Sequence, residues 1–243
     1  MNTYISVSFS RERLYRIPRP LRGMYSFRAV ETAAYCPRKL YYRRNSPPEG
    51  DPPDEVRARR EIAFAYDKLL ADERALREAP IAVTPTTFRS QLGCAKARLG
   101  EDWNHIVSPD EREGFLSGRD CHGVAHKLFA CSPPSASLIF TGKPPERGVW
   151  EPQSVRLMAV AKALSWERET AVKRVFAEYP AHGIIREVPV DGRRAAAYRK
   201  ALRTVQTLDG PPARVDNRAK CSPCEYRGNC GVRTRSLRSL LGG

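Results

Sequence analysis

Apolar residues recur at helical spacing in several stretches of the chain. The longest stretch runs from Asp54 to about Arg77, and Asp54 can act as its N-cap. Its apolar stripe consists of Val56, Ile62, Ala63, Tyr66, Leu69 and Leu70. Further helices are expected over residues 85–99, 109–116, 152–167 and from Asp191, as a cap, to about Thr207. Residues 26–42 predict a short helix, a stop at Cys36-Pro37 and a second, aromatic-rich turn.

Strand patterns begin only after these first helices. Residues 123–129 and 137–140 are short strand candidates around the turn C-S-P-P-S. Residues 171–179 and 184–190 are rich in β-formers, and P-A-H-G between them indicates a hairpin. The order of helices, strand pair, helix, hairpin and helix predicts an α/β (α+β) fold with a small mixed sheet flanked by helices.

Composition favours a soluble chain, with 41% hydrophobic and 28% charged residues. No run of about 18 apolar residues occurs, so no transmembrane helix is expected. The N-terminus lacks the apolar region and cleavage site of a signal peptide, which favours a cytoplasmic location. Thiols stay reduced there, so clustered cysteines suggest a metal site more than disulfides.

Positive charge is concentrated at the two ends of the chain, whose formal net charge is +15. Residues 1–45 hold ten Lys and Arg against two Asp and Glu, and residues 211–243 hold seven against two. Two basic ends on a nearly neutral body suggest a polyanion-binding surface, with nucleic acid as the first candidate. The alternative is basic tails without a specific partner. Residues 1–23 are either a basic extension or precede a true start at Met24, and residues 24–243 are expected to form one domain.

Three cysteines, Cys221, Cys224 and Cys230, are spaced C-x2-C-x5-C near the C-terminal end of the sequence. A fourth ligand must come from elsewhere, and Cys36, before a proline among basic and aromatic residues, is the best candidate. One remote cysteine with this spacing favours a [4Fe–4S] cluster, with zinc or no metal as alternatives. The other cysteines, Cys94, Cys121 and Cys131, are expected to be ordinary residues.

The segments A-A-Y-C-P-R-K-L-Y-Y (residues 33–42) and K-C-S-P-C-E-Y-R-G-N-C (residues 220–230) resemble the CRISPR-associated exonuclease family, which has the RecB-like fold of the PD-(D/E)xK superfamily. The resemblance extends over about residues 24–235. It implies a [4Fe–4S] cluster on Cys36, Cys221, Cys224 and Cys230 that joins the two ends. It also implies a restriction-endonuclease-like core, single-stranded DNA as ligand and CRISPR adaptation proteins as partners.

The catalytic motifs of that family are degenerate here. Its members carry an Asp on one strand, E-x-K on the next and Q-x-x-x-Y on the following helix. The Asp corresponds to Asp120 or, in a shifted register, to a position occupied by His126. The E-x-K strand falls on Leu138-Ile139-Phe140, and the helix motif falls on Arg156 and Val160. One carboxylate is too few for a catalytic Mg²⁺ or Mn²⁺.

Three hypotheses follow. The first is an iron–sulfur protein that binds DNA ends and has lost hydrolysis. Its DNA-binding candidates combine cations and aromatic rings, which also suit packing around a cluster: Arg38, Lys39, Tyr41, Tyr42, Arg43 and Arg44. The second is an active divalent-metal-dependent exonuclease with a rearranged site around Asp120, Glu146 and Glu151. The third is a zinc-stabilised structural protein without nucleic-acid chemistry.

Overall fold

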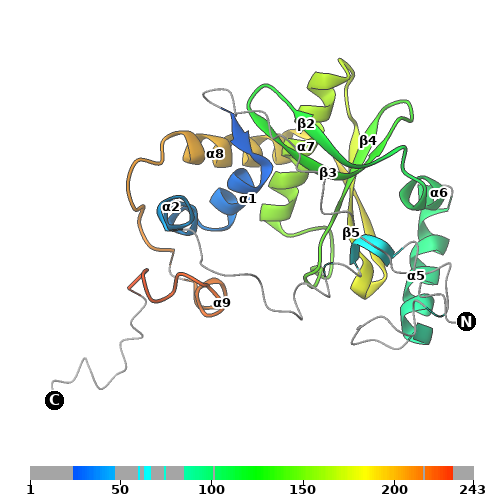
Figure 1. Ribbon diagram of the computed structural model, residues 1–243, viewed down its shortest axis with the longest axis horizontal. Coiled ribbons are helices and arrows are strands. Elements are labelled where there is room, and N and C mark those ends of the chain that lie inside the picture. The colour runs from blue at the N-terminus through cyan, green and yellow to red at the C-terminus, as the bar shows by residue number, and fades with distance from the viewer. Residues whose placement is uncertain are drawn as a thin grey trace, which may run out of the picture.

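A mixed sheet of six strands lies between two sets of helices in the computed structural model (Figure 1). The structure describes residues 24–46, 60, 63–66, 74, 85–100, 102–215 and 217–231. The strands are β1 (Tyr25–Ser26), β2 (Glu111–Ser117), β3 (Cys121–Phe129), β4 (Ser135–Ile139), β5 (Arg174–Tyr179) and β6 (Ile184–Pro189). The helices are α1 (Phe27–Tyr35), α2 (Pro37–Asn45), α5 (Pro85–Leu99), α6 (Asp102–Val107), α7 (Glu151–Glu167), α8 (Gly192–Gln206) and α9 (Arg218–Cys221), with a 3-10 turn, η1 (Pro180–His182).

The sheet is open, and its strands follow the order β1-β3-β4-β5-β6, with β2 also paired to β3. β1 runs parallel to β3, and β4 runs parallel to β5. The pairs β2–β3, β3–β4 and β5–β6 are antiparallel. The predicted α+β class with a small mixed sheet is therefore confirmed.

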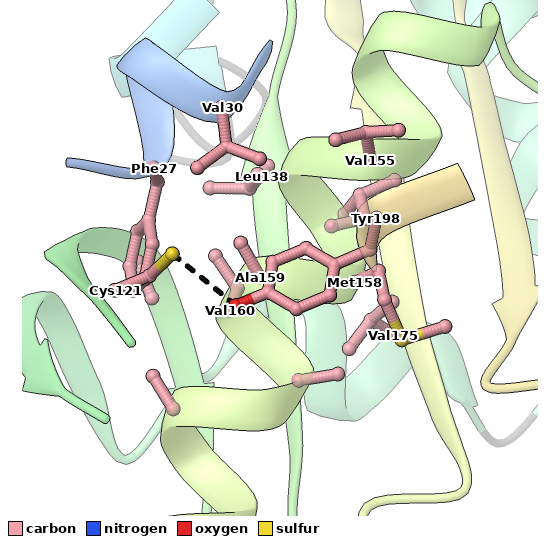
Figure 2. Packing of buried hydrophobic residues seen from close by; sticks show 14 of the residues in the cluster. Phe27, Val30, Cys121, Leu138, Val155, Met158, Ala159, Val160, Val175 and Tyr198 are labelled. Carbon is pink, nitrogen blue, oxygen red and sulfur yellow. Dashed lines mark hydrogen bonds between the residues drawn. The ribbon is translucent and has the colours of Figure 1, made fainter. Parts of the chain in front are cut away.

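The larger core lies between the sheet and helices α1, α7 and α8. α7 buries eight side chains, namely Val155, Leu157, Met158, Ala159, Val160, Ala161, Ala163 and Leu164. A helix that is apolar on nearly every side must be covered on every side. In Figure 2 the Tyr198 ring of α8 reaches into this core, and its hydroxyl lies 3.2 Å from the Cys121 thiol of β3. Burial raises the pKa of Cys121 to about 11, so this thiol is an inert core residue, as predicted.

The opposite face of the sheet carries a smaller core beneath α5 and α6. Its buried members are Tyr66, Leu92, Trp103, Ile106, Phe129, Phe176 and Ile185. The rings of Phe129 and Phe176 meet edge to face, with centroids 6.2 Å apart. Helices on both faces therefore shield the central strands from water.

One predicted helix is wrong. Residues 109–116 do not form it: α6 ends at Val107, and Glu111–Ser117 form β2, paired with β3 from Glu111↔Leu128 to Ser117↔His122. Pro109 accounts for the stop, because it disfavours helical backbone in the preceding Ser108. Gly114 and Leu116 are buried in alternation, which is the period of a strand.

The other described elements agree with the sequence pattern. The α8 cap is confirmed, because the Asp191 carboxylate accepts a hydrogen bond from the Arg194 backbone N–H at 2.8 Å. Most of the helix predicted from Asp54 to Arg77, and residues 1–23, lie outside the described residues. Within the described residues, no helix has the length and apolar character that crossing a membrane requires.

Candidate functional site

The four cysteines singled out by the sequence line one hollow, although Cys36 and Cys221 are separated by 185 positions. This cysteine hollow is also lined by Arg38, Lys39, Tyr42, Arg214, Val215, Lys220, Tyr226 and Arg227. Each of the four thiols is partly buried and none forms a disulfide. The junction of α1 and α2 supplies one thiol, and the C-terminal segment from α9 to Cys230 supplies three.

Local backbone geometry presents these thiols toward the same space. Cys36 is the N-cap of α2 in an extended conformation, and Pro37 fixes the first helical turn after it. Cys221 ends the short helix α9, whose N-cap Asn217 accepts from the Lys220 backbone N–H at 3.1 Å. Two tight turns follow, because the Cys224 N–H donates to the Cys221 carbonyl and the Cys230 N–H donates to the Tyr226 carbonyl.

Reciprocal contacts hold the two distant segments together. The Tyr35 hydroxyl donates to the Lys220 carbonyl at 3.2 Å, and the Lys220 ammonium donates to the Tyr35 carbonyl at 3.1 Å. The same ammonium lies 5.1 Å from the centre of the Tyr35 ring. Lys39 forms an ion pair with Glu225 at 2.8 Å. Burial raises the pKa of Tyr35, and the neighbouring Cys224 and Cys36 thiols add to the shift.

Most of the predicted DNA-binding residues make structural contacts here. Arg38 donates to the Pro212 carbonyl at 3.3 Å, and both terminal nitrogens of Arg44 lie 3.3 Å from the Val205 carbonyl. The Tyr42 ring stacks on Tyr226 with centroids 5.9 Å apart, and its hydroxyl donates to the Asn229 carbonyl. The Tyr41 ring meets that of Tyr42 edge to face.

Two of the six predicted residues, Lys39 and Arg43, line a second hollow beside the first. Arg28, Glu31, Thr32, Tyr35 and Pro152 complete its lining. Arg43 also donates to the Thr32 hydroxyl at 3.4 Å. Lys39, Arg43 and the Tyr35 ring therefore bring cations and an aromatic ring together at this second hollow.

No group of three or more His, Cys, Asp and Glu side chains in the described ranges already has the arrangement that holds a single metal ion. Four cysteine thiolates are nevertheless the ligand set of both a [4Fe–4S] cluster and a structural zinc. The donor chemistry of the cysteine hollow thus fits either group, and Cys36, Cys221, Cys224 and Cys230 are the residues that would hold it.

At the position expected for the nuclease centre, the sheet opens around His126. The β3–β4 ladder extends from Phe129↔Ser135 to Lys127↔Ser137. Beyond it, the Ile139 N–H donates to the His126 Nδ1 at 2.7 Å instead of to a β3 carbonyl. Burial, together with the nearby cations of Arg156 and Arg60, lowers the pKa of His126 to about 3. His126 is therefore neutral near pH 7, with its ring proton on Nε2.

Around His126 lies an arginine hollow of about 230 Å³. Its polar and charged lining residues are Ser26, Arg28, Arg60, Glu113, His126 and Arg156. Arg156, at the first position of the expected Q-x-x-x-Y motif, lies 3.4 Å from the Glu31 carboxylate. Burial lowers the pKa of Arg156 while Glu31 opposes that shift.

The remaining predicted catalytic residues are not brought together. Leu138, Ile139 and Phe140 are all buried apolar side chains where E-x-K was expected. Asp120 lies in the turn between β2 and β3, beside the second half of α7 at Lys162 and Trp166.

Glu151 and Glu146 lie elsewhere. Glu151 begins α7, roughly 16 Å along the helix axis from Lys162 at 1.5 Å per residue. The backbone carbonyl of Glu146 accepts from Arg186 of β6 at 3.0 Å. The rearranged carboxylate site of Asp120, Glu146 and Glu151 therefore has no shared location in the described structure.

Sequence reasoning missed a buried ion pair on the other face of the sheet. The Lys127 ammonium and Glu178 carboxylate lie 2.7 Å apart, with side chains 1% and 0% exposed. Glu178 also accepts hydrogen bonds from the hydroxyls of Tyr66 and Ser137, and Lys127 donates to the Ile106 carbonyl at 2.8 Å. Glu178 stands between Ala177 and Tyr179, and Leu128 and Phe129 follow Lys127; these largely apolar strand segments were the available signal.

No family model matches the chain, and no curated protein matches it. A solved protein described as "Crystal structure of SSO0001" is similar over 88% of each chain, with 14% sequence identity and a TM-score of 0.43. A likeness at this level assigns neither a family nor a function.

Proposed function

We propose that this chain holds a metal group on four cysteines and binds single-stranded DNA without hydrolysing it. The observation that carries the proposal is the convergence of Cys36 with Cys221, Cys224 and Cys230 on one hollow. A [4Fe–4S] cluster is the favoured occupant, and zinc is the alternative with the same ligands. When bound, either group would link the α1–α2 junction covalently to the C-terminal segment.

The DNA-binding part of the proposal rests on the second hollow and its surroundings. Arg28, Lys39 and Arg43 provide cations for phosphates, and Tyr35 provides a ring beside them. The metal group would stabilise this surface indirectly, because Lys39 and Tyr35 both contact the C-terminal segment.

Loss of hydrolysis is supported by the chemistry at the expected nuclease centre. Two-metal or one-metal phosphodiester hydrolysis needs carboxylates that hold the ion and activate water. In this chain a neutral histidine, an arginine and apolar side chains occupy the corresponding positions. No observation favours the active-exonuclease alternative.

Metal content of anaerobically purified full-length protein tests the first part. We expect iron and sulfide, or zinc, in the wild type and in Cys94→Ala, whose exposed thiol is a matched control. Cys36→Ala should lose most of the metal, because a site with three thiolates lacks its fourth ligand. A Cys36→Ala protein with a full metal complement would refute the assignment of the fourth ligand, and a metal-free wild type would refute the metal site.

End-labelled single-stranded DNA with Mg²⁺ or Mn²⁺ tests the second part. We expect binding that weakens as salt rises, because Lys and Arg displace counterions from phosphates, and we expect intact DNA. Cleavage that disappears in Asp120→Ala would overturn the proposal in favour of an active nuclease.

A further inference from the structure

Three arginines and two carboxylates surround the arginine hollow, so positive charge is in excess there. Arg28, Arg60 and Arg156 line it, against the exposed carboxylate of Glu113 and the Glu31 carboxylate that pairs with Arg156. Within the described part of the chain, Arg28 and Arg60 have no carboxylate or carbonyl partner, and Arg60 contacts only the Phe64 ring at 5.7 Å. Like charges gathered around one hollow repel one another, and the Arg156 side chain is mostly buried, so this cluster favours an anionic ligand.

Without an anionic ligand, the neighbouring cations lower one another's pKa. Burial lowers the pKa of Arg28, and the neighbouring Arg43 and Arg156 lower it further, while Glu31 only partly opposes them. The Arg156 Nε is buried and has no hydrogen-bond partner among the residues that the structure describes. A bound anion would satisfy such donors and relieve the repulsion at the same time.

Two further features provide donors of the right kind. The nine-residue helix α1 begins at this hollow, with its N-cap Ser26 and its first residues in the lining, and a helix N-terminus attracts negative charge. The His126 Nδ1 accepts from Ile139, so the remaining ring donor is the Nε2–H. The hollow of about 230 Å³ is smaller than typical pockets for drug-sized ligands, about 300–1,000 Å³, and suits a small group.

We propose that the arginine hollow is a metal-independent binding site for a phosphate group, held by Arg28, Arg60 and the His126 Nε2–H. Arg156 positions the site through its ion pair with Glu31. The phosphate group is either free phosphate or the terminal phosphate of a nucleic-acid strand. The site involves no bond making or breaking. It goes beyond the proposed function because it requires neither the cysteine metal group nor Lys39 and Arg43, although Arg28 lines both hollows.

Isothermal titration calorimetry of the full-length protein with inorganic phosphate, at constant ionic strength and with EDTA present, tests the site. We expect saturable binding that weakens about tenfold or more in Arg28→Gln and in Arg60→Gln, because each loses a charge-assisted hydrogen bond. Arg193→Gln, at an exposed position in the first turn of α8, should bind phosphate like the wild type. Binding that only EDTA-free, metal-loaded protein shows would overturn metal independence.

Oligothymidylates with and without a 5′ phosphate distinguish the two sources. If the phosphorylated strand competes with inorganic phosphate and the unphosphorylated strand does not, the site accepts strand ends; if neither competes, it accepts free phosphate. Phosphate binding without any affinity for oligonucleotides leaves this site standing and refutes the DNA-binding proposal. Absent phosphate binding, or equal binding by wild type, Arg28→Gln and Arg60→Gln, refutes the site whatever the oligonucleotides do.

Discussion

The buried Lys127–Glu178 pair gives the sharpest prediction about stability. Both side chains are almost completely inaccessible, and both are surrounded by hydrogen bonds to neutral groups. Lys127→Met leaves the Glu178 carboxylate with two hydroxyl donors but no cation. Glu178→Gln leaves the Lys127 ammonium with the Ile106 carbonyl and the Tyr66 hydroxyl as neutral acceptors. Either change leaves a buried charge without its oppositely charged partner in a region of low dielectric constant.

The expected loss for each single variant is about 3–5 kcal/mol of unfolding free energy, which is the cost of breaking a buried pair by removing one partner. For a chain of this size, about 2–4 °C per kcal/mol gives a decrease in Tm of roughly 6–20 °C. The double variant Lys127→Met/Glu178→Gln contains no unpaired buried charge. Its loss of unfolding free energy should therefore be smaller than the sum of the two single losses, by up to about 3 kcal/mol.

Urea denaturation monitored by circular dichroism, with thermal melting in parallel, measures the stability of the wild type, the two single variants and the double variant Lys127→Met/Glu178→Gln. Glu187→Gln is the control, since the Arg174–Glu187 pair is 39% and 47% exposed and should change stability by less than about 1 kcal/mol. Single variants that lose no more than this control, or a double variant that loses the full sum, would refute the reasoning.

Two other predictions concern the sheet and its contact with α7. The pKa of His126 is about 3 in the folded chain against about 6.5 in the unfolded chain. The contribution of the neutral imidazole to the free energy of unfolding is therefore complete above pH 6.5 and falls as the pH drops toward 3. At pH 5 the loss is about 2 kcal/mol. His126→Gln should flatten that dependence relative to the wild type in denaturation curves between pH 5 and 7.5, and parallel curves would contradict the buried neutral imidazole. A Cβ on Gly118 would lie 2.7 Å from the Ala163 Cα, so Gly118→Ala should cost about 1–3 kcal/mol, whereas Gly142→Ala, with no atom within 4 Å, should be nearly neutral in the same melts.

Local signals in the sequence predicted much of the fold. The Asp191 cap, the stop at Pro37 and the strand pair around C-S-P-P-S all depend on neighbouring residues and recur in the structure. Glu111–Ser117 was mispredicted because its short pattern satisfies helical and strand periods alike, and its pairing with β3 decided the outcome. Strand partners are a long-range property that a local pattern does not encode.

In the candidate site, too, local sequence signals identified some residues, whereas features that depend on long-range contacts were missed. The cysteines could be identified because thiols are rare and their spacing is informative, and the structure places all four around one hollow. Lys127 and Glu178 could not be paired from the sequence, since 51 positions separate them and charged residues in strands usually face water. The arginine hollow depends on side chains from α1, β3 and α7 that meet only in the folded chain.

The separation of 185 positions between Tyr35 and Lys220 also determines how long the first segment exists before its partner is synthesised. At about 5–20 residues per second, the ribosome needs roughly 10–40 s to travel from one to the other. During that interval α1 and α2 exist without Lys220, Glu225 and Asn229, and Cys36 is a single thiol without its three companions. The cysteine hollow can therefore assemble only after Cys230 has been synthesised, so any metal would have to bind after that point.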